Sequence, residues 1–580
     1  MINKTLTSFE KRVLWGLFFV GIISFIFFVI FYVHMYGKSV PDYGGTYKEG
    51  VVGQPQFINP VLSDINDVNR DISELVFSGL LKYDGDGNLI NDLAKDYSIS
   101  EDGKIYMVNL RENVFWHDGQ NFTADDVIFT IKSIQDPTLK SPLAINWYGI
   151  KIEKINDYAL QFDLENPYSP FIESLTVGII PKHIWSKIAV NNFSLSEFNL
   201  KPVGTGPYKF VSFQKEKSGM ILSYDLARNE RYYEKPAFIE KIIFYFFPTE
   251  DKALSELNSG MINGMSSLSI KNRDALTNSD IIINKISLFR YFAVFFNQSQ
   301  NRVLSEKEVR QALGLAINKQ EIIEGVFHND AVAVNFPIPE NLNITPLEYK
   351  GVMGFSQEKA ASLLEKEGWK IKEGDEFRSK KLTPSITKDF LGKRPDTTVA
   401  TLADFTLEID LMIPELAEFI KIGEIIKRSW EAIGVKTNLK FIPAQTQENL
   451  QDVQQQYIRP RNYQALLFGH VFLSQPDLFS FWYSSQKKDP GLNLSLYDNK
   501  EIDKLLDDIR QTVDPKKRVL KLNNLQALIL DDAPAIFLYN PYYLYPTSSQ
   551  IKGIDIKNIV LPSKRFSQVE NWYISTKTDF

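Results

Sequence analysis

Histidines are the side chains best suited to metal binding and to acid–base catalysis near neutral pH, and their spacing here favours neither role. No two of the five lie at the short intervals that metal ligands on one helix or hairpin require. The chain has no cysteine, which excludes disulfides, zinc–thiolate sites, thiolate nucleophiles and a cysteine-linked lipid anchor. The local signatures HExxH, GxSxG, the P-loop and a GxGxxG following a strand are also missing. We therefore expect no metal, no cofactor and no enzymatic activity. The histidines are His34, His117, His183, His328 and His470.

One glycine-rich segment superficially resembles a phosphate-binding loop. The segment Gly204–Pro207 lacks the lysine that directly follows the last glycine of a phosphate-binding loop, and no helix is expected after it. Strand-like residues 208–213 come next instead. We interpret the segment as a tight turn leading into that strand.

Aromatic side chains are abundant, with 41 Phe, 26 Tyr and 8 Trp. Most of them are predicted to lie in the core, because large rings dominate burial. A minority fall in loops beside Asn, Ser and Gln, a combination that can hold a flexible ligand by shape and a few hydrogen bonds. These candidates are Trp147, Tyr148, Phe472, Phe479 and Trp482.

An N-terminal segment is long enough to cross a membrane. Residues 13–33 are 21 uncharged residues, about 31 Å as a helix at roughly 1.5 Å per residue, which matches a hydrocarbon core of about 30 Å. Positive charges before it predict that residues 1–12 stay in the cytoplasm and that the ectodomain is extracytoplasmic. The length of the segment and the lack of a small-residue cleavage site favour an uncleaved signal anchor over a cleaved signal peptide. Residues 34–45 read as a short flexible tether between membrane and fold.

The remaining chain mixes strands and helices. Short aromatic and aliphatic runs predict strands up to about residue 300, and helices are more frequent afterwards. Capping boxes are expected at Thr123–Asp126 and Ser305–Glu308. A helix ending at Gly434 and followed by an alternating strand predicts a helix-then-strand unit. This pattern indicates α/β lobes, and 580 residues suffice for about three or four domains. Residues 370–396 carry 13 charged residues without a sustained period, which we interpret as a surface insertion. With 65 Lys+Arg against 71 Asp+Glu and no long basic run, nucleic acid is excluded as a partner.

Several motifs, in a fixed order, resemble those of family 5 extracellular solute-binding proteins, the peptide- and nickel-binding receptors of ABC importers. The stretch Ser73 to Thr130 resembles the signature region of the family, with its Gly-Leu pair and the elements LA, DG, LR, HDG and TADDV in order. Later segments continue the resemblance over nearly the whole ectodomain. They read PVGTGPYKF (202–210), LARNERYYEKP (226–236), VRQALGLAINKQEII (309–323), SQEKAASLLEKEGW (356–369) and LILDDAPAIFLY (528–539).

The resemblance implies a two-lobed, periplasmic-binding-protein-like α/β fold with three subdomains, in which the ligand lies between the lobes. Ligand binding would then shift a hinge equilibrium toward a closed form that a permease recognises. Carried onto this chain, lobe I is expected at 46–63, 203–290 and 536–580, an inserted subdomain at 64–202, and lobe II at 291–535.

Two departures from the family pattern affect the expected ligand and location. Peptide-binding members place an aspartate for the α-amino group of the ligand in the stretch equivalent to Gly469–Asp477, where this chain has Phe472, Leu473, Ser474 and Gln475, with Asp477 at a later position. An uncharged site would forfeit a charge-assisted hydrogen bond of roughly 1.5 to 3 kcal/mol. A blocked peptide, an oligosaccharide or another amphiphile therefore stays open as the ligand. The second departure is the N-terminal membrane anchor. Many members of the family are instead lipoproteins or freely periplasmic proteins.

The resemblance implies a membrane-anchored substrate-binding subunit of an ABC importer for oligopeptides or similar small amphiphilic solutes. We expect a monomer whose partners are the solute, the permease and ATPase subunits, and the membrane at residues 13–33. A stand-alone surface sensor using the same cleft is the alternative, and an envelope enzyme is a further one. The residues expected to contact ligand are Asn59, Trp147, Tyr148, Asn297, Phe472, Gln475, Phe479, Trp482 and Tyr539. For Asn297, a strand-end cap is an equal alternative.

Overall fold

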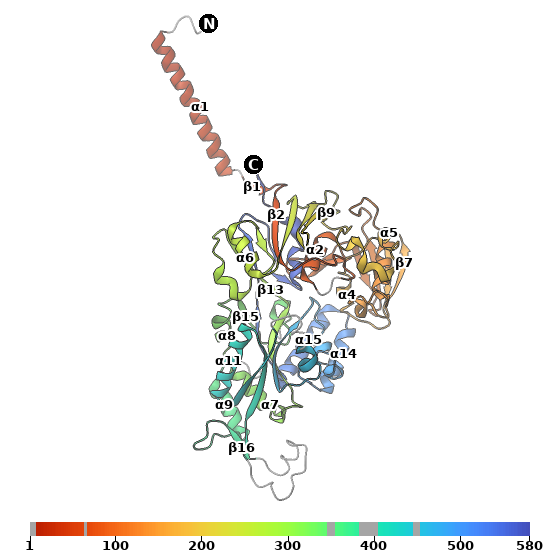
Figure 1. Ribbon diagram of the computed structural model, residues 1–580, viewed down its shortest axis with the longest axis vertical. Coiled ribbons are helices and arrows are strands. Elements are labelled where there is room, and N and C mark those ends of the chain that lie inside the picture. Colours follow the sequence, from red (N-terminus) through yellow and green to blue (C-terminus); the bar gives the residue numbers. More distant parts are fainter. Residues whose placement is uncertain are drawn as a thin grey trace.

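The computed structural model describes residues 7–36, 38–62, 66–344, 354–381, 404–444 and 453–579. They form a long N-terminal helix and two stacked lobes, and the C-terminus lies near the point where the helix meets the first lobe (Figure 1). Three larger sheets, of eight, four and six strands, organise the two lobes. The α/β fold class is therefore as predicted.

The eight-stranded sheet forms lobe I and is assembled from distant parts of the chain, in the order β23-β13-β22-β12-β2-β11-β10-β9. Near its centre, β2 pairs in parallel with β11. The sequence of β11 alternates buried and half-buried residues, as expected for a strand with one face on the core. The strands are β2 (Thr46–Val52), β9 (Tyr208–Lys215), β10 (Ile221–Arg228), β11 (Lys241–Phe247), β12 (Gly264–Met265), β13 (Ile281–Leu288), β22 (Tyr543–Ser548) and β23 (Asn558–Ile559). The helices are α2 (Asp67–Val76), α6 (Glu250–Ser259) and the 3₁₀ helix η10 (Pro562–Phe566).

The inserted subdomain is built on a four-stranded antiparallel sheet in the order β5-β6-β8-β7. Its longest helix, α3, begins with the predicted capping box, in which the side chains of Thr123 and Asp126 each accept from the backbone of the other residue. Its buried side chains share one core with lobe I. The elements are β3 (Leu81–Tyr83), β4 (Leu89–Asn91), β5 (Ala94–Ile99), β6 (Ile105–Leu110), β7 (Lys151–Asn156), β8 (Ala159–Asp163), α3 (Ala124–Gln135), η2 (Ala144–Trp147), α4 (Phe171–Ser174) and α5 (Lys182–Trp185).

Lobe II surrounds a six-stranded sheet in the order β15-β21-β14-β20-β18-β19. Strand β14 is central and almost fully buried, which explains its continuous apolar sequence. Strands β18 and β19 pair in parallel across α11, the helix-then-strand unit that the sequence predicts. The strands are β14 (Arg290–Phe296), β15 (Ala331–Ala333), β18 (Glu408–Pro414), β19 (Lys436–Ile442), β20 (Ala465–Val471) and β21 (Ala535–Pro541). The helices are α7 (Lys307–Leu315), α8 (Lys319–Gly325), α9 (Gln357–Lys366), α11 (Ala417–Glu431), α13 (Phe479–Trp482), α14 (Lys500–Gln511) and α15 (Pro515–Asp532).

Two neighbouring strand connections join the lobes. Strand β13 of lobe I runs into β14 of lobe II, and β21 of lobe II runs into β22 of lobe I. The two connections are bonded to each other: Asn540 Nδ2 donates to the carbonyl of Leu288 at 2.8 Å, and Arg290 Nη2 donates to that of Pro541 at 3.2 Å. Because β21 belongs to the sheet of lobe II, the chain returns to lobe I between β21 and β22 rather than at residue 536.

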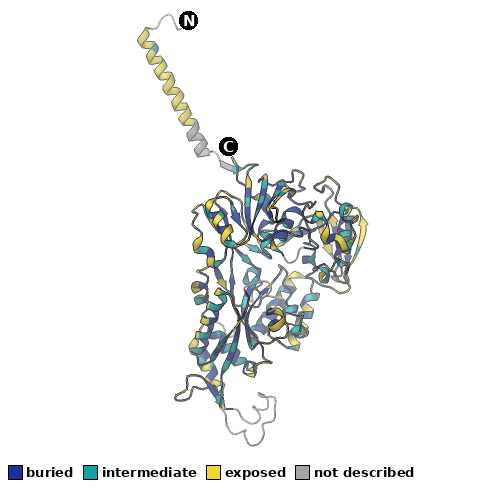
Figure 2. Ribbon diagram, viewed as in Figure 1, coloured by how far each residue is buried: buried dark blue, intermediate teal, exposed yellow. Residues whose placement is uncertain are grey.

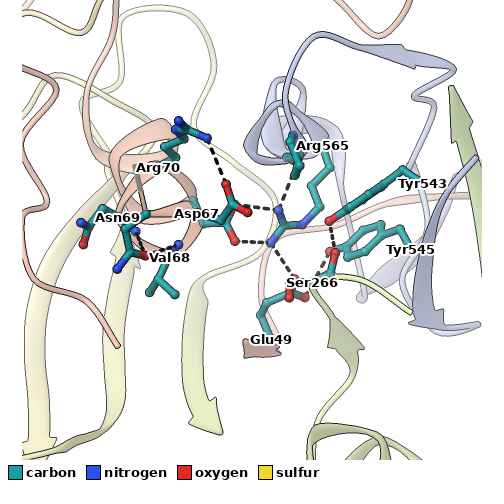
Figure 3. Close-up of polar contacts among 12 residues, drawn as sticks. Glu49, Asp67, Val68, Asn69, Arg70, Ser266, Tyr543, Tyr545 and Arg565 are labelled. Carbon is teal, nitrogen blue, oxygen red and sulfur yellow. Dashed lines mark hydrogen bonds and ion pairs between the residues drawn. The ribbon is translucent and has the colours of Figure 1, made fainter. Parts of the chain in front are cut away.

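A fully buried charge cluster joins the two ends of lobe I (Figure 3). The guanidinium of Arg565, in η10, lies between two carboxylates, with Nη2 2.9 Å from Glu49 Oε1 and 2.6 Å from Asp71 Oδ2. Burial raises the pKa of both carboxyls, and the charge of Arg565 opposes that rise. Strand β2, helix α2 and the C-terminal segment are thereby held together around one cation.

The N-terminal helix α1 (Ser8–Tyr36) stands apart from the lobes, with its described side chains mostly exposed (Figure 2). Within the described chain, its residues Ser8–Phe28 form the one helix that is long and apolar enough to cross a membrane. The flexible tether predicted at 34–45 is wrong in its first part, where α1 continues to Tyr36, and again at 38–41. There β1 (Lys38–Pro41) pairs with β24 (Thr576–Asp579), a partner more than 500 residues away that the local sequence could not reveal.

The charged stretch 370–396, interpreted as a surface insertion, is mostly exposed over its described residues 370–381, but it is tied to the rest of lobe II at Arg378. Strand β16 (Ser379–Lys381) pairs with β17 (Asp404–Thr406). The buried side chain of Arg378 donates to the carbonyls of Ile433 and Trp369, at 2.7 and 2.9 Å. These carbonyls satisfy a guanidinium that composition alone assigns to the surface. Residues 382–396 lie outside the described residues.

Candidate functional site

A cavity of about 1040 Å³ lies between the lobes. This volume is at the upper end of the range of small-ligand sites. Lobe I and the inserted subdomain contribute one side, and lobe II contributes the other. Residues lining the cavity come from α2 and 77–83, from 143–150 and 164–178, from 560–570, and from 471–481 together with Leu492 and Arg510.

The lobe II side of the cavity begins where β20 ends. The backbone N–H of Phe472 donates to the carbonyl of Phe289 at 2.7 Å, which fixes the chain as it leaves the sheet. The Phe472 ring packs against Tyr291 and Phe481 and is almost fully buried. The contacts of Phe472 therefore hold in place the start of the segment that leads to α13 and lines the cavity.

Asp477 and Arg510 place an ion pair at the cavity wall. Arg510 Nη2 lies 3.0 Å from Asp477 Oδ2, and the Tyr168 hydroxyl donates to the same oxygen at 3.3 Å. The other carboxylate oxygen accepts from the N–H of Phe479 at 3.1 Å. Both oxygens of Asp477 are thus already engaged, and the pair connects lobe II to the inserted subdomain.

A second carboxylate, Glu173 in α4, also reaches across to lobe II. Its Oε1 accepts from Ser474 Oγ at 2.6 Å and from the N–H of Gln475 at 2.5 Å. Its Oε2 accepts from the hydroxyl of Tyr83. Burial raises the pKa of Glu173, and these hydrogen bonds to the ionised form lower it.

A third charged group lies where lobe I meets the inserted subdomain. Lys82 Nζ is 2.5 Å from Glu234 and 3.9 Å from both Asp92 and Glu570. Asp92 also accepts from the hydroxyl of Tyr233. Burial raises the pKa of Asp92 to about 7, although Lys82 and Tyr233 each lower it.

The raised pKa of Asp92 predicts a pH-dependent contribution to stability. The folded protein holds a proton on Asp92 at pH values where the unfolded chain has lost it, so this contribution falls as pH rises from about 4 to about 7. Asp92→Asn should abolish that fall. Thermal unfolding at several pH values should show wild type losing stability relative to the variant over this range, and a pH-independent difference would contradict the assignment.

Lys564 and Glu74 form a fourth polar pair on the lobe I side, with Nζ 2.6 Å from Oε2. The hydroxyls of Ser73 and Ser567 lie in the same part of the lining, and both are buried without a hydrogen-bond partner among the described residues. Because Lys564 directly precedes Arg565, the buried charge cluster of lobe I supports this wall.

Apolar side chains occupy the outer part of the same cavity. The exposed fractions of Ile145 and Tyr148, on the inserted subdomain, are 78% and 86%. Val471, Leu473 and Leu492 of lobe II are also exposed while lining the cavity. Apolar side chains around a polar interior suit an amphiphilic ligand with charged or polar groups and apolar side chains.

The structure brings together four of the nine residues expected to contact ligand, namely Trp147, Tyr148, Phe472 and Gln475, which all line the cavity. Their contact with ligand stays a prediction. Phe479 lies beside the lining, where its ring stacks on Tyr483 and under the guanidinium of Arg510.

The other four expected residues are buried away from the cavity lining. Asn59 bonds to Asn199 and to the N–H of Val61. Asn297 donates to the carbonyl of Arg461 and accepts from the N–H of Ser299, so it has the strand-end role that was its alternative.

Trp482 and Tyr539 belong to the core of lobe II. Trp482 packs against Phe295 and Phe537, because the single turn of α13 directs it toward the sheet. Tyr539 stacks on Phe292 within the same sheet. A Trp482→Ala variant is therefore expected to destabilise the unliganded protein.

The position that the family pattern gives to the aspartate is uncharged in this chain, from Phe472 to Gln475, but the cavity as a whole is charged. Asp477 lines the cavity from lobe II, and Glu173, Lys82 and Lys564 line it from the side of lobe I and the inserted subdomain. Sequence reasoning missed Glu173 because its partners Ser474 and Gln475 are about 300 residues away. The nearest signal in the sequence is segment 472–477, whose hydroxyl and amide groups can donate hydrogen bonds to a carboxylate.

Two buried histidines have structural roles. His117 Nδ1 accepts from the N–H of Gly204, and its Nε2 donates to the carbonyl of Gly206. Burial lowers the pKa of His117 to about 4 and that of His470 to about 3. Among the described residues, no group of three or more His, Asp or Glu side chains is arranged to hold a metal ion.

Comparison with known proteins identifies the family. The model of the bacterial extracellular solute-binding proteins, family 5 (middle), matches residues 88–491, which is more than half of the chain. The chain belongs to this family. Members are non-enzymatic binding proteins, so this family 5 protein has a solute-binding role and is not an enzyme.

The family 5 protein has curated relatives along most of its length. It is 26% identical over 552 residues to the oligopeptide-binding protein AppA of Bacillus subtilis (strain 168), covering 92% of each chain. It is 24% identical over 534 residues to the dipeptide-binding protein of Escherichia coli (strain K12), covering 86% of this chain and 90% of that one.

Solved structures show the same fold. The ABC transporter substrate-binding protein CtaP from Listeria monocytogenes superposes with a TM-score of 0.74 at 25% identity, covering 92% of this family 5 protein and 99% of that chain. AppA from Bacillus subtilis, solved with a nonapeptide, superposes with a TM-score of 0.66 at 24% identity, covering 92% and 100%.

Proposed function

We propose that this protein is the membrane-anchored substrate-binding subunit of an ABC importer and that it captures oligopeptides between its lobes. The observation that carries the proposal is the cavity of about 1040 Å³, which is lined by both lobes and lies beside two bonded inter-lobe connections. A ligand in this position contacts both lobes and favours the closed arrangement. The names of the relatives, which are peptide-binding proteins, support peptides as the ligand class.

Anchoring by α1 is part of the proposal. The helix is apolar, its residues 8–28 are exposed apart from one half-buried position, and it precedes a short segment paired with the C-terminal strand. An uncleaved helix would keep the binding lobes close to a permease in the same membrane, raising their local concentration. The binding protein could then deliver its solute to the permease and ATPase subunits without diffusing freely outside the membrane.

We further propose that a free α-amino group is not required. In the stretch Gly469–Asp477, Asp477 lies later than the aspartate of the family pattern, and its two oxygens are bonded to Arg510, Tyr168 and the N–H of Phe479. Both oxygens of Glu173 are likewise engaged by donors of the protein. An incoming ammonium group would have to compete with these donors.

Thermal unfolding of the full chain in lipid nanodiscs tests the function. The ligands would be pooled peptides with free or acetylated N-termini, oligosaccharides and a nickel–histidine complex. A ligand at 100 times its Kd stabilises by about 2.7 kcal/mol, which raises the Tm of a chain of this length by about two degrees. We expect both peptide pools to raise Tm equally. Peptide binding would be contradicted if only the sugars or the nickel complex raised Tm, or if no ligand did. If only peptides with free N-termini raised Tm, the proposal that a free α-amino group is not required would be contradicted.

A further inference from the structure

A second cavity of about 310 Å³ adjoins the first at helix α4. Neighbouring residues of the inserted subdomain line alternate cavities: Tyr168 and Glu173 line the larger one, and Ser169 and Ile172 line the smaller one. On lobe II, Gln475 lines both cavities. The contact between α4 and this part of lobe II is therefore the wall that separates the two cavities.

Hydrogen bonds between the lobes hold this wall together. Glu173 accepts from Ser474 Oγ at 2.6 Å and from the N–H of Gln475 at 2.5 Å. Beside it, the N–H of Ser169 donates to the carbonyl of Arg510 at 2.9 Å. The Glu173 side chain is only 5% exposed and has no ion-pair partner within the described residues. Its charge is therefore balanced by these donors and by the hydroxyl of Tyr83.

Gln475 is fixed from its other side as well. Its Oε1 accepts from Arg518 Nη1 at 2.9 Å, and Arg518 Nη2 donates to the carbonyl of Pro476 at 2.8 Å. Arg518 is itself buried and lines the smaller cavity. The lobe II half of the wall is thus rigid, so the wall opens only if the contact with Glu173 is lost.

The smaller cavity has the chemistry of an additional peptide subsite. The rings of Tyr97, Tyr106 and Phe289 supply apolar surface, and the side-chain amides of Asn341 and Asn343 supply donors and acceptors. Its volume is about 30% of that of the larger cavity. A cavity of this size has room for a short piece of extended peptide chain, which advances about 3.3 Å per residue.

We propose that the Glu173 bridge holds the cleft closed beside α4 and thereby sets the upper limit of ligand length. With the bridge intact, a peptide ends at the wall in the larger cavity. With the bridge removed, the two cavities become continuous and the peptide extends into the smaller one. The length limit rests on the proposed peptide-binding function, whereas the closure of the cleft does not.

Titration calorimetry of the full chain in detergent micelles, with an alanine-based peptide series of increasing length, tests the length limit. We expect the wild-type affinity to fall at least tenfold beyond a certain length. Glu173→Ala should move that limit to longer peptides. Glu173→Gln keeps an oxygen acceptor and should keep the wild-type limit. Glu153→Ala, an exposed carboxylate on β7 of the same subdomain, is the matched control and should also keep it.

A ligand-free measurement separates this inference from the proposed function. Because the chain has no cysteine, spin labels can be placed at Lys132→Cys on α3 and Lys504→Cys on α14, both exposed positions. Glu173→Ala should lengthen or broaden the distance between the labels, and Glu153→Ala should not. An unchanged distance, or an unchanged length limit in a protein that binds peptides, overturns the inference. If wild type binds no peptide, the proposed function fails and the distance alone decides whether the bridge closes the cleft.

Discussion

Replacing Arg565 by methionine is expected to lower the free energy of unfolding by about 3 to 5 kcal/mol. The substitution removes the cation between Glu49 and Asp71, whose side chains are 0% and 1% exposed. Two buried carboxylates would then face each other without a positive charge, which costs far more than an exposed ion pair contributes. Tm should fall by about 3 to 4 degrees, because the unfolding entropy of a chain of this length is about 1.2 kcal/mol per kelvin.

Thermal unfolding of the full chain checks this value against a matched variant. Arg428→Met removes an arginine whose ion pair with Glu321 is exposed, and it should change stability by less than about 1 kcal/mol. Adding Glu49→Gln and Asp71→Asn to the Arg565→Met variant should restore part of the loss, because the buried charges disappear. Equal effects of the two arginine substitutions would show that the cluster is not what holds the ends of lobe I together.

Gly204→Ala is expected to destabilise the protein by about 3 kcal/mol or more through a backbone clash. A Cβ at this position would lie 1.8 Å from the carbonyl oxygen of Val76, at the end of α2. That oxygen already accepts from the N–H of Gly206 at 2.9 Å, so it is not free to move. Residues Phe77 to Gly79, which follow α2, line the cavity, and the clash should therefore also weaken ligand binding.

Gly325→Ala provides the control for this prediction. Gly325 is the last residue of α8, and a Cβ there meets nothing within 4 Å. Alanine should be neutral or slightly stabilising at that position, because it has the higher helix propensity. If thermal unfolding gave the two variants the same Tm, the close approach of 204–206 to α2 would be contradicted.

Local signals in the sequence predicted local structure well. The capping box at Thr123 is present, and Gly434 has the expected positive φ after α11. A second capping box, expected to begin at Ser305, is wrong. There the Ser305 hydroxyl donates to the carbonyl of Arg302 in a short 3₁₀ turn, and α7 begins only at Lys307. The same hydroxyl can cap the following helix or bond within the preceding turn, and the sequence does not show which of the two hydrogen bonds forms.

The candidate site was less predictable, because its polar groups meet across the fold. An aromatic residue in a loop, such as Trp147, could be proposed from its neighbours, but Trp482 has the same local appearance and faces the core of lobe II. The bonds of Glu173 to lobe II and of Lys82 to Glu570 join residues hundreds of positions apart. Only the packing of the lobes determines which carboxylates reach the cavity.

Titration calorimetry with the peptide that raises Tm most tests the central claim, that solute binds in the cavity between the lobes. Wild type should give a saturable one-to-one titration. Ser480→Trp, which places a large ring in the cavity lining, should lower the affinity at least tenfold, whereas Ser485→Trp, at an exposed position outside the lining, should bind as wild type does. Binding that Ser480→Trp leaves unchanged would place the solute elsewhere and contradict the account.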